Sequence, residues 1–361
     1  MKVDGVWRRP IWDEDGAVRV IDQTRLPFAF ESAPLADLDA AARAIRDMIV
    51  RGAPLIGATA AYGVALAMRD DAGDAGLARA CDVLGATRPT AVNLAWALES
   101  MRARLAPEAP SARADAALAA ARALVEDDVA LNKRIGAAGL PLLRAAAERR
   151  GGRVDVLTHC NAGWLATCDW GTATAPIYLA HEEGIDVHVW VDETRPRNQG
   201  AALTAWELGN HGVAHDVIVD NAGGHYMQQG AVDLCLVGTD RTARNGDVAN
   251  KIGTYLKALA ARDCGVPFYV CLPSPTIDWS LADGRAIPIE ERAEEEVTHI
   301  LGQDAEGALR RVRVAAPGSP ARNPGFDVTP ARLVSGLVTE RGVAEASEAG
   351  LLALFPERAA A

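Results

Sequence analysis

The sequence predicts an α/β protein: a mostly helical N-terminal domain with a small β element, followed by a Rossmann-like C-terminal domain built on a parallel sheet. Up to about residue 148, apolar residues recur mainly with the period of a helix. From Gly151 onward, short β-branched runs alternate with helical segments, which is typical of a parallel sheet covered on both faces. The stretch GGR at 151–153 is the predicted junction, so the predicted domains are 1–148 and 151–361.

Two short β-rich runs, VWRRPIW and AVRVIDQTRLP, open the N-terminal domain and suit a small sheet or ribbon. Helical periods are predicted next, over residues 35–50, 54–70, 90–105 and 111–150. The last is rich in alanine, but its recurring Leu and Val residues favour a packed helix over a linker. The small apolar run at 53–68 is too short for a membrane span, and its glycines indicate close helix packing.

The C-terminal domain contains five continuous apolar runs that are predicted to be strands of one sheet. They lie at 154–159, 185–193, 215–220, 232–240 and 266–273. Helical segments separate them, including 175–184, 201–212 and 248–265.

Composition excludes several classes of function. The formal net charge of −11 leaves no basic face for nucleic acid. Six cysteines without a CxxC pair, together with no signal-peptide pattern, predict a reducing cytoplasm, and no run predicts a membrane span. None of the seven histidines stands at metal-ligand spacing, so we expect no metal.

Polar or glycine-rich turns follow all five predicted strands. In an open parallel sheet, ligands bind outside the carboxyl ends of the strands, so five such turns on one rim predict a site. The chain has no GxGxxG after the first strand, no GxxxxGK[ST] and no GxSxG, which argues against a dinucleotide, a nucleoside triphosphate or a serine nucleophile. The turns include residues 160–163, 193–200, 221–224, 240–251 and 273–275.

Two segments are predicted to bind phosphate. Asn250 and Lys251 fall in the first turn of a predicted helix, where free N–H groups attract an anion. Arg51, Gly52 and Ala53 precede another helix that has proline near its start, and the glycine lets the backbone approach a ligand. The alternatives are a solvated lysine at a helix start and an arginine that only packs the domains together.

Cys160 and Asp240 are the candidate acid/base pair. A cysteine at a strand end is more often a packing residue than a catalytic one. Here an acid at the end of the fourth strand reaches the same rim beside both phosphate-binding segments, which favours chemistry. The alternative for Asp240 is a turn cap. Three further carboxylates on nearby loops compete with it: Asp192, Glu193 and Asp247.

Seven segments resemble the methylthioribose-1-phosphate isomerases of methionine salvage. They are RGAPLIG (51–57), TRPTAVNL (87–94), THCNAG (158–163), VDETRPRNQGA (191–201), DNAGG (220–224), VGTDRTARNGDVANKIGTY (237–255) and NPGFDVTPARLVSGLVTERGV (323–343). The likeness covers nearly the whole chain in the same order. That family is related to regulatory subunits of the translation-initiation exchange factor and to ribose-1,5-bisphosphate isomerases.

The resemblance implies a homodimer that needs no metal or organic cofactor. It implies that Cys160 and Asp240 form the catalytic pair, with Asp240 as proton donor. The substrate contacts that it implies are Arg51, Gly52, Ala53, Arg88, Gln199, Asn250 and Lys251.

One segment departs from the family pattern. Trp164 and the stretch CDWG, which contains Cys168 and Trp170, stand where the family usually has small residues and glycines. We expect them to reshape the pocket, which leaves the group at C5 of the sugar open between methylthio and deoxy. The residues also leave two routes of hydrogen transfer open. Either a Cys160 thiolate moves the proton from C2 to C1 through an enolate, or a hydride shifts directly. A non-catalytic regulatory subunit on the same fold is the competing class.

Overall fold

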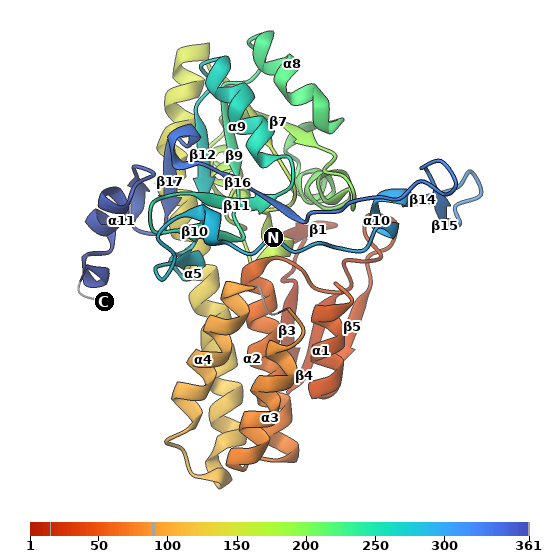
Figure 1. The fold of residues 1–361 in the computed structure, drawn as a ribbon, viewed down its shortest axis with the longest axis vertical. Coiled ribbons are helices and arrows are strands. Elements are labelled where there is room, and N and C mark those ends of the chain that lie inside the picture. The colour runs from red at the N-terminus through yellow and green to blue at the C-terminus, as the bar shows by residue number, and fades with distance from the viewer. Residues whose placement is uncertain (15, 89–90, 360–361) are drawn as a thin grey trace.

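The structure, a computed structural model, describes residues 1–14, 16–88 and 91–359. Figure 1 shows a helical N-terminal part below a sheet-containing C-terminal part, with the long helix α5 (Pro110–Arg150) running beside both. The change from helix to sheet comes at Gly151 and Gly152, between α5 and β6 (Arg153–Thr158). None of the described helices is long and apolar enough to cross a membrane.

The N-terminal part has the expected small β element and a helical bundle. Its strands are β1 (Lys2–Val3), β2 (Val6–Trp7), β3 (Ile11–Glu14), β4 (Ala17–Ile21) and β5 (Ser32–Leu35). Its helices, beside α5, are α1 (Leu38–Arg46), α2 (Ala53–Asp70), α3 (Asp74–Gly85) and α4 (Val92–Leu105). α3 was not among the predicted helices. Residue 90, where the helix corresponding to α4 was predicted to begin, lies outside the described residues.

Helix α2 is the centre of this part. Every residue from Leu55 to Met68 is buried, because neighbouring helices surround it. Its glycines allow the close packing that the sequence predicts: a Cβ on Gly57 would lie 3.0 Å from the Asn93 carbonyl oxygen, and one on Gly63 would lie 3.0 Å from Ala41.

The main sheet has seven strands in the order β18-β17-β12-β9-β6-β7-β8. All neighbours pair in parallel except β17 and β18. All five predicted strands occur in it, so the fold class is confirmed. The strands beside β6 are β7 (Asp186–Asp192), β8 (Ala214–Ile218), β9 (Leu234–Val237), β12 (Phe268–Cys271), β17 (Gly336–Thr339) and β18 (Gly342–Ala344).

Helices cover both faces because alternate strand residues point to opposite sides. In β9, Leu234 and Leu236 pack with α5, α6 and α7, whereas Cys235 and Val237 pack with α8 and α9. The helices are α6 (Thr174–Glu182), α7 (Ala205–His211, after the π-helical turn Gly200–Thr204), α8 (Gly223–Gln228), α9 (Thr254–Asp263) and α11 (Glu348–Leu354).

The strand order places the chain reversal at β6. The chain runs outward through β7 and β8 and then returns to form β9 on the other side of β6. In open parallel sheets such a reversal opens a crevice at the carboxyl ends of the two central strands. Cys160 follows β6 and Asp240 follows β9, so both candidates lie at this crevice.

A second, four-stranded sheet corrects one prediction. β10 (Arg241–Ala243), β11 (Val248–Lys251), β13 (Ile277–Asp278) and β16 (Phe326–Thr329) form it in the order β13-β10-β11-β16. Asn250 and Lys251 therefore end a strand, and their predicted place in the first turn of a helix is wrong. They pair with Asp327 and Phe326, more than 70 residues away in sequence, and α9 begins only at Thr254.

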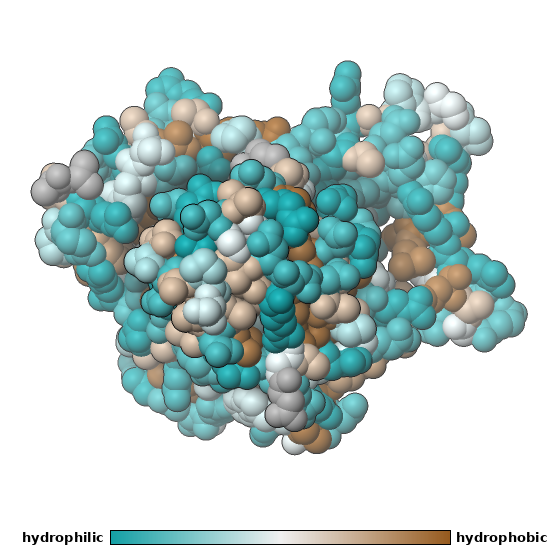
Figure 2. Space-filling view, turned by 90° about the horizontal axis from the view of Figure 1, so that it is seen from below, coloured by the Kyte–Doolittle hydropathy of each residue, from teal (hydrophilic) through white to brown (hydrophobic). Residues whose placement is uncertain are grey.

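A hairpin extends from the C-terminal part at the right of Figure 1. It consists of β14 (His299–Gln303) and β15 (Leu309–Arg313), preceded by the short helix α10 (Glu295–Thr298). Figure 2 shows a mostly hydrophilic face on which hydrophobic residues gather beside a hollow at the right of the view.

Candidate active site

Cys160 is held by its backbone in an uncommon conformation. Its φ is +66°, in the left-handed region that non-glycine residues rarely adopt. Its N–H donates to Thr194 Oγ1 at 2.8 Å, and its carbonyl accepts from Thr204 Oγ1 at 2.7 Å. The thiol donates to Gln199 Oε1 at 3.2 Å. Neighbouring loops thus fix both the backbone and the sulfur.

Asp240 is positioned by the second sheet. Its N–H donates to the Ala249 carbonyl at 2.9 Å, and the preceding Thr239 hydroxyl donates to the same carbonyl at 2.8 Å. Asp240 therefore sits where the main sheet passes into the smaller one. The alternative role of Asp240, capping a turn, does not require a position between the two sheets.

Cys160 and Asp240 line one small cavity of about 40 Å³, deep between the two parts of the molecule. The three rival carboxylates do not line it. Asp192 pairs with His159 and Lys257, and Asp247 accepts backbone N–H groups of Gly284 and Ala331. Other predicted site residues on its lining are Arg51, Gly52, Ala53 and Asn250.

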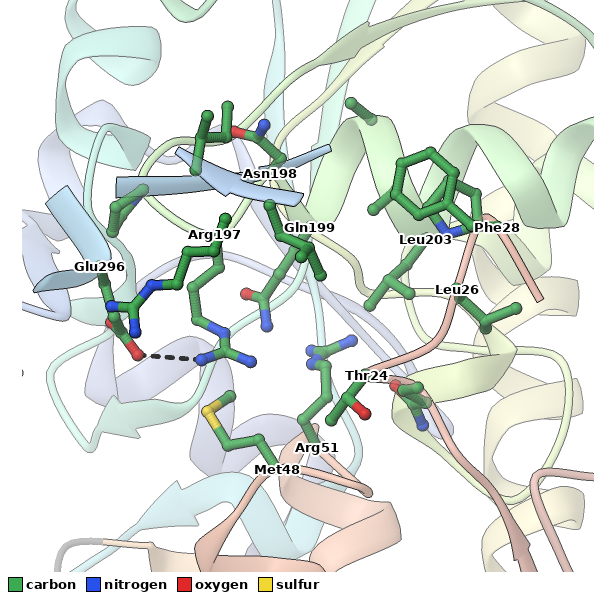
Figure 3. A pocket seen from close by; sticks show the side chains of 18 of the residues that line it. Thr24, Leu26, Phe28, Met48, Arg51, Arg197, Asn198, Gln199, Leu203 and Glu296 are labelled. Atoms are coloured by element: carbon green, nitrogen blue, oxygen red, sulfur yellow. Dashed lines mark hydrogen bonds and ion pairs between the residues drawn. The ribbon is translucent and has the colours of Figure 1, made fainter. Parts of the chain in front are cut away.

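A larger cavity of about 480 Å³ adjoins the first and shares Arg51 with it. In Figure 3, Arg51 and Gln199 enter this cavity from opposite sides. Much of its wall is apolar, and the remainder is polar or charged. The apolar residues are Leu26, Pro27, Phe28, Met48, Pro196, Ala201, Ala202, Leu203, Ile300 and Leu301.

Gly52 allows Arg51 to approach the loop that follows β6. Its φ is +91°, and a Cβ there would overlap the backbone of Ala166. Glycine at the N-cap of α2 therefore lets the two parts of the chain touch at the cavity wall. Arg51 Nη2 then donates to the Asn161 carbonyl at 2.8 Å, and Nη1 donates to Asn161 Oδ1.

Lys251 is a buried cation beside both candidates, only 7% exposed. Burial lowers the pKa of Lys251, while Cys160 and Asp240 oppose the shift. Its ammonium lies 5.3 Å from the Phe326 ring centroid. Asn250 donates to Thr254 Oγ1 at 3.0 Å, which orders the start of α9.

Burial controls the protonation of the pair. It raises the pKa of the Cys160 thiol, against the opposing charges of Arg51 and Lys251. It also raises the pKa of Asp240, against Lys251, Arg88 and Arg51. Burial therefore disfavours the charged form of both groups, while the neighbouring cations favour it.

Arg88 lies farther out than the other predicted residues. It lines neither cavity and forms an ion pair with Glu290 at 3.0 Å, so only its charge reaches Asp240. Its predicted contact with substrate stays a prediction.

Trp164, Cys168 and Trp170 do not reshape the pocket, and that expectation is wrong. Trp164 and Trp170 pack in the apolar cluster under the main sheet, and Cys168 packs in the helical cluster. Neither cavity has them on its lining. Their loop turns them away from Cys160 because large apolar side chains gain more by burial than by lining a polar cavity.

Among the described residues, one group has the composition of a metal site. Ligand atoms of His159, Asp192 and Asp220 lie within 4.8 Å of one another. The Lys257 ammonium lies 3.1 Å from Asp192 Oδ2 and contacts the Asp220 carbonyl. Lys257 therefore already supplies the positive charge that a bound cation would bring.

The comparisons with known proteins agree with this geometry. The profile of the Initiation factor 2 subunit family matches residues 49–346. A protein named methylthioribose-1-phosphate isomerase from Acidiphilium cryptum is 63% identical over 363 residues, covering 99% of each chain. The chain belongs to the methylthioribose-1-phosphate isomerase group of this family. The resemblance is thereby confirmed, and the chain is an isomerase.

Two solved structures place the fold in the same family. The 5-methylthioribose 1-phosphate isomerase of Pyrococcus horikoshii superposes with a TM-score of 0.85 at 38% identity, covering 97% of this chain and 96% of that one. A chain named as the delta subunit of translation initiation factor eIF-2B from A. fulgidus has a TM-score of 0.80 at 38% identity, covering 97% and 100%. The family fold therefore carries proteins of both names.

Proposed function

We propose that this isomerase converts 5-methylthioribose 1-phosphate to 5-methylthioribulose 1-phosphate, with Asp240 and Cys160 at the reacting carbons. The observation that carries the proposal is the shared lining of one small cavity by the Asp240 carboxyl group, the Cys160 thiol and Arg51, with burial raising the pKa of the first two. The guanidinium suits a phosphate, and the acid suits a ring oxygen that leaves.

The adjoining apolar cavity supports a methylthio group at C5. A sugar phosphate held by Arg51 can extend its other end toward Leu26, Phe28 and Leu203. Burying the S–CH₃ group there is worth about 1–2 kcal/mol, or roughly a tenfold preference over a 5-deoxy sugar.

A second phosphate at C5 fits this cavity poorly. Glu295 and Glu296 stand on its wall, and Arg197 is already paired with Glu296 at 2.9 Å (Figure 3). Besides Arg51 and the paired Arg197, Arg311 is the one arginine on the described wall, so a ribose 1,5-bisphosphate would bring its second dianion mainly toward carboxylates and apolar carbon, which costs binding energy.

The chemistry begins with the acid. The phosphate on C1 prevents spontaneous ring opening, so the C1–O4 bond must break while the phosphate stays. Protonated Asp240 donates to O4 as that bond breaks. The positive charges of Lys251 and Arg51 act on Asp240 and stabilise the carboxylate that this proton transfer leaves.

The state of Cys160 favours a direct shift of hydride from C2 to C1. Its S–H donates to Gln199 and its pKa is raised, so the thiolate needed for enolate formation is disfavoured in the resting site. We propose that hydride moves within the substrate while the C2 hydroxyl gives its proton to the Asp240 carboxylate, which restores the acid for the next turnover. Cys160 shapes the site around the two carbons.

The competing non-catalytic class is opposed by the buried charges. A regulatory subunit does not need an acid, a thiol and two buried cations around a 40 Å³ cavity, because such groups are costly to bury.

Two measurements test the function. We expect turnover of 5-methylthioribose 1-phosphate, with kcat/KM roughly tenfold above that for 5-deoxyribose 1-phosphate because of the apolar cavity. Equal values would contradict the assignment of that cavity, and no turnover of either would overturn the proposed function.

The second measurement follows the hydrogen. Deuterium placed at C2 should be retained at C1 of the product, since the shift is internal. Extensive exchange with water would instead require the enolate route.

A further inference from the structure

Glu207 is a fully buried carboxylate that the mechanism does not use. It lies on α7 and is 0% exposed. Four groups donate to it, two on each oxygen. Oε1 accepts from Asn161 Nδ2 and the Leu165 N–H, each at 2.9 Å, and Oε2 accepts from the Trp164 N–H and the Tyr178 hydroxyl, each at 3.1 Å.

Three of these donors belong to the loop that directly follows Cys160. The loop lies so close to the carboxylate that a Cβ on Gly163 would overlap Glu207 Oε2. Two backbone N–H groups that no sheet or helix could satisfy there are bonded to this one side chain. Glu207 therefore determines the path of residues 161–165.

Asn161 connects Glu207 to the cavity. Its Nδ2 donates to Glu207 and, at 3.2 Å, to Thr204 Oγ1, so its Oδ1 must face the other way. There it accepts from Arg51 Nη1, while the Asn161 carbonyl accepts from Nη2. Which end of the amide faces Arg51 is decided by the acceptors behind it.

We propose that Glu207 is a positioning residue, which fixes Arg51 for the substrate phosphate through the orientation of the Asn161 amide. The inference rests on the proposed function, in which Arg51 binds that phosphate. Arg51 is buried, and the direction of its guanidinium depends on these two acceptors. Burial raises the pKa of Glu207 to about 7, and its four donors favour the ionised form above that pH.

Replacement of Glu207 by Gln is the first test. A glutamine amide offers one acceptor oxygen, and its NH₂ group would face two of the four donors. The Asn161 amide then loses its fixed orientation. We expect KM for the sugar phosphate and Kd for inorganic phosphate, measured by calorimetry, to rise at least tenfold, with a smaller change in kcat.

Tyr178→Phe is the matched control. It removes one donor to the same carboxylate from α6 and leaves the loop contacts in place. We expect it to lower Tm while KM and the phosphate Kd stay within about twofold. Asn161→Ala leaves Glu207 three donors and keeps the test open if Glu207→Gln fails to fold; it should weaken phosphate binding to a similar extent.

A double-mutant cycle separates positioning from general damage. In an Arg51→Ala background, Glu207→Gln should have little further effect on phosphate affinity, since the group it orients is gone. Additive losses, unchanged phosphate affinity in Glu207→Gln or Asn161→Ala, or no phosphate binding by the wild type would each overturn the proposal. Failure of the wild type to turn over either sugar phosphate would instead count against the proposed function, because the phosphate measurement does not depend on the sugar.

Discussion

At the scale of single residues, we propose that the pair Cys160 and Asp240 carries the chemistry. Both follow the carboxyl ends of adjacent strands and share one cavity, and burial raises the pKa of both against the opposing effect of nearby cations. Their identity as strand-end residues was predictable from sequence. Their place on one rim was predicted too, whereas the size and lining of their common cavity depend on β9 returning to the side of β6.

Replacing either residue should abolish turnover. We expect Asp240→Asn to lower kcat at least a hundredfold, because the amide cannot donate a proton in the same way. Cys160→Ser should also lower kcat strongly, since the smaller hydroxyl changes the shape beside the reacting carbons. Steady-state kinetics give the loss and circular dichroism checks the fold. Near-normal kcat in either variant would remove that residue from the mechanism.

The pH profile should report on Asp240. Its pKa is raised and its protonated form is the acid, so kcat/KM should fall as pH rises through that pKa. Lys251 opposes the shift, so Lys251→Met should raise the pKa further and move the falling limb to higher pH. Lys133→Met, beside Trp170, serves as the control and should leave the limb in place. If the falling limb of the pH profile does not move in Lys251→Met, it reports the titration of a group other than Asp240.

At the scale of elements, the start of α2 and the strand β11 bring the proposed binding groups Arg51 and Asn250 to the cavity. The sequence correctly placed Gly52 before a helix. It wrongly placed Lys251 in one, because β11 exists only through pairing with β10 and with the distant β16. Sequence patterns over a few residues predict local structure. They predict poorly a short strand that is stabilised by pairing with distant segments.

Gly52→Ala should damage both stability and activity. The new methyl group would be strained by the positive φ and would overlap the Ala166 backbone. Gly151→Ala is a matched control, since its φ is +83° with nothing within 4 Å of the new Cβ. We expect about 1–2 kcal/mol of destabilisation from strain in Gly151→Ala with normal kcat/KM, and a larger loss with reduced kcat/KM in Gly52→Ala. Denaturant unfolding gives the stability of the two variants, and steady-state kinetics gives their kcat/KM. Equal effects in both variants would show that the close approach of Gly52 to Ala166 is unimportant.

At the scale of the whole molecule, we propose a homodimer. The edge strand β8 leaves Val217 47% and the following Val219 59% exposed, and unpaired edges of this kind favour contact with another chain. Light scattering after size exclusion should give twice the 38.0 kDa chain mass. A mass of one chain at micromolar concentration would contradict this.

The sequence by itself determined the elements: their periodicity predicted the helical bundle, the parallel strands and the polar turns at the strand ends. Motifs in the chain also identified the family. Only the tertiary structure decided what those turns face. From the sequence alone, Glu207 is an ordinary acidic residue of a predicted helix, and Trp164 is expected at the pocket. Folding buries Glu207 against the Cys160 loop and turns Trp164 into the core. The physical reason is that side-chain burial and long-range pairing depend on contacts between distant segments, which no local pattern encodes.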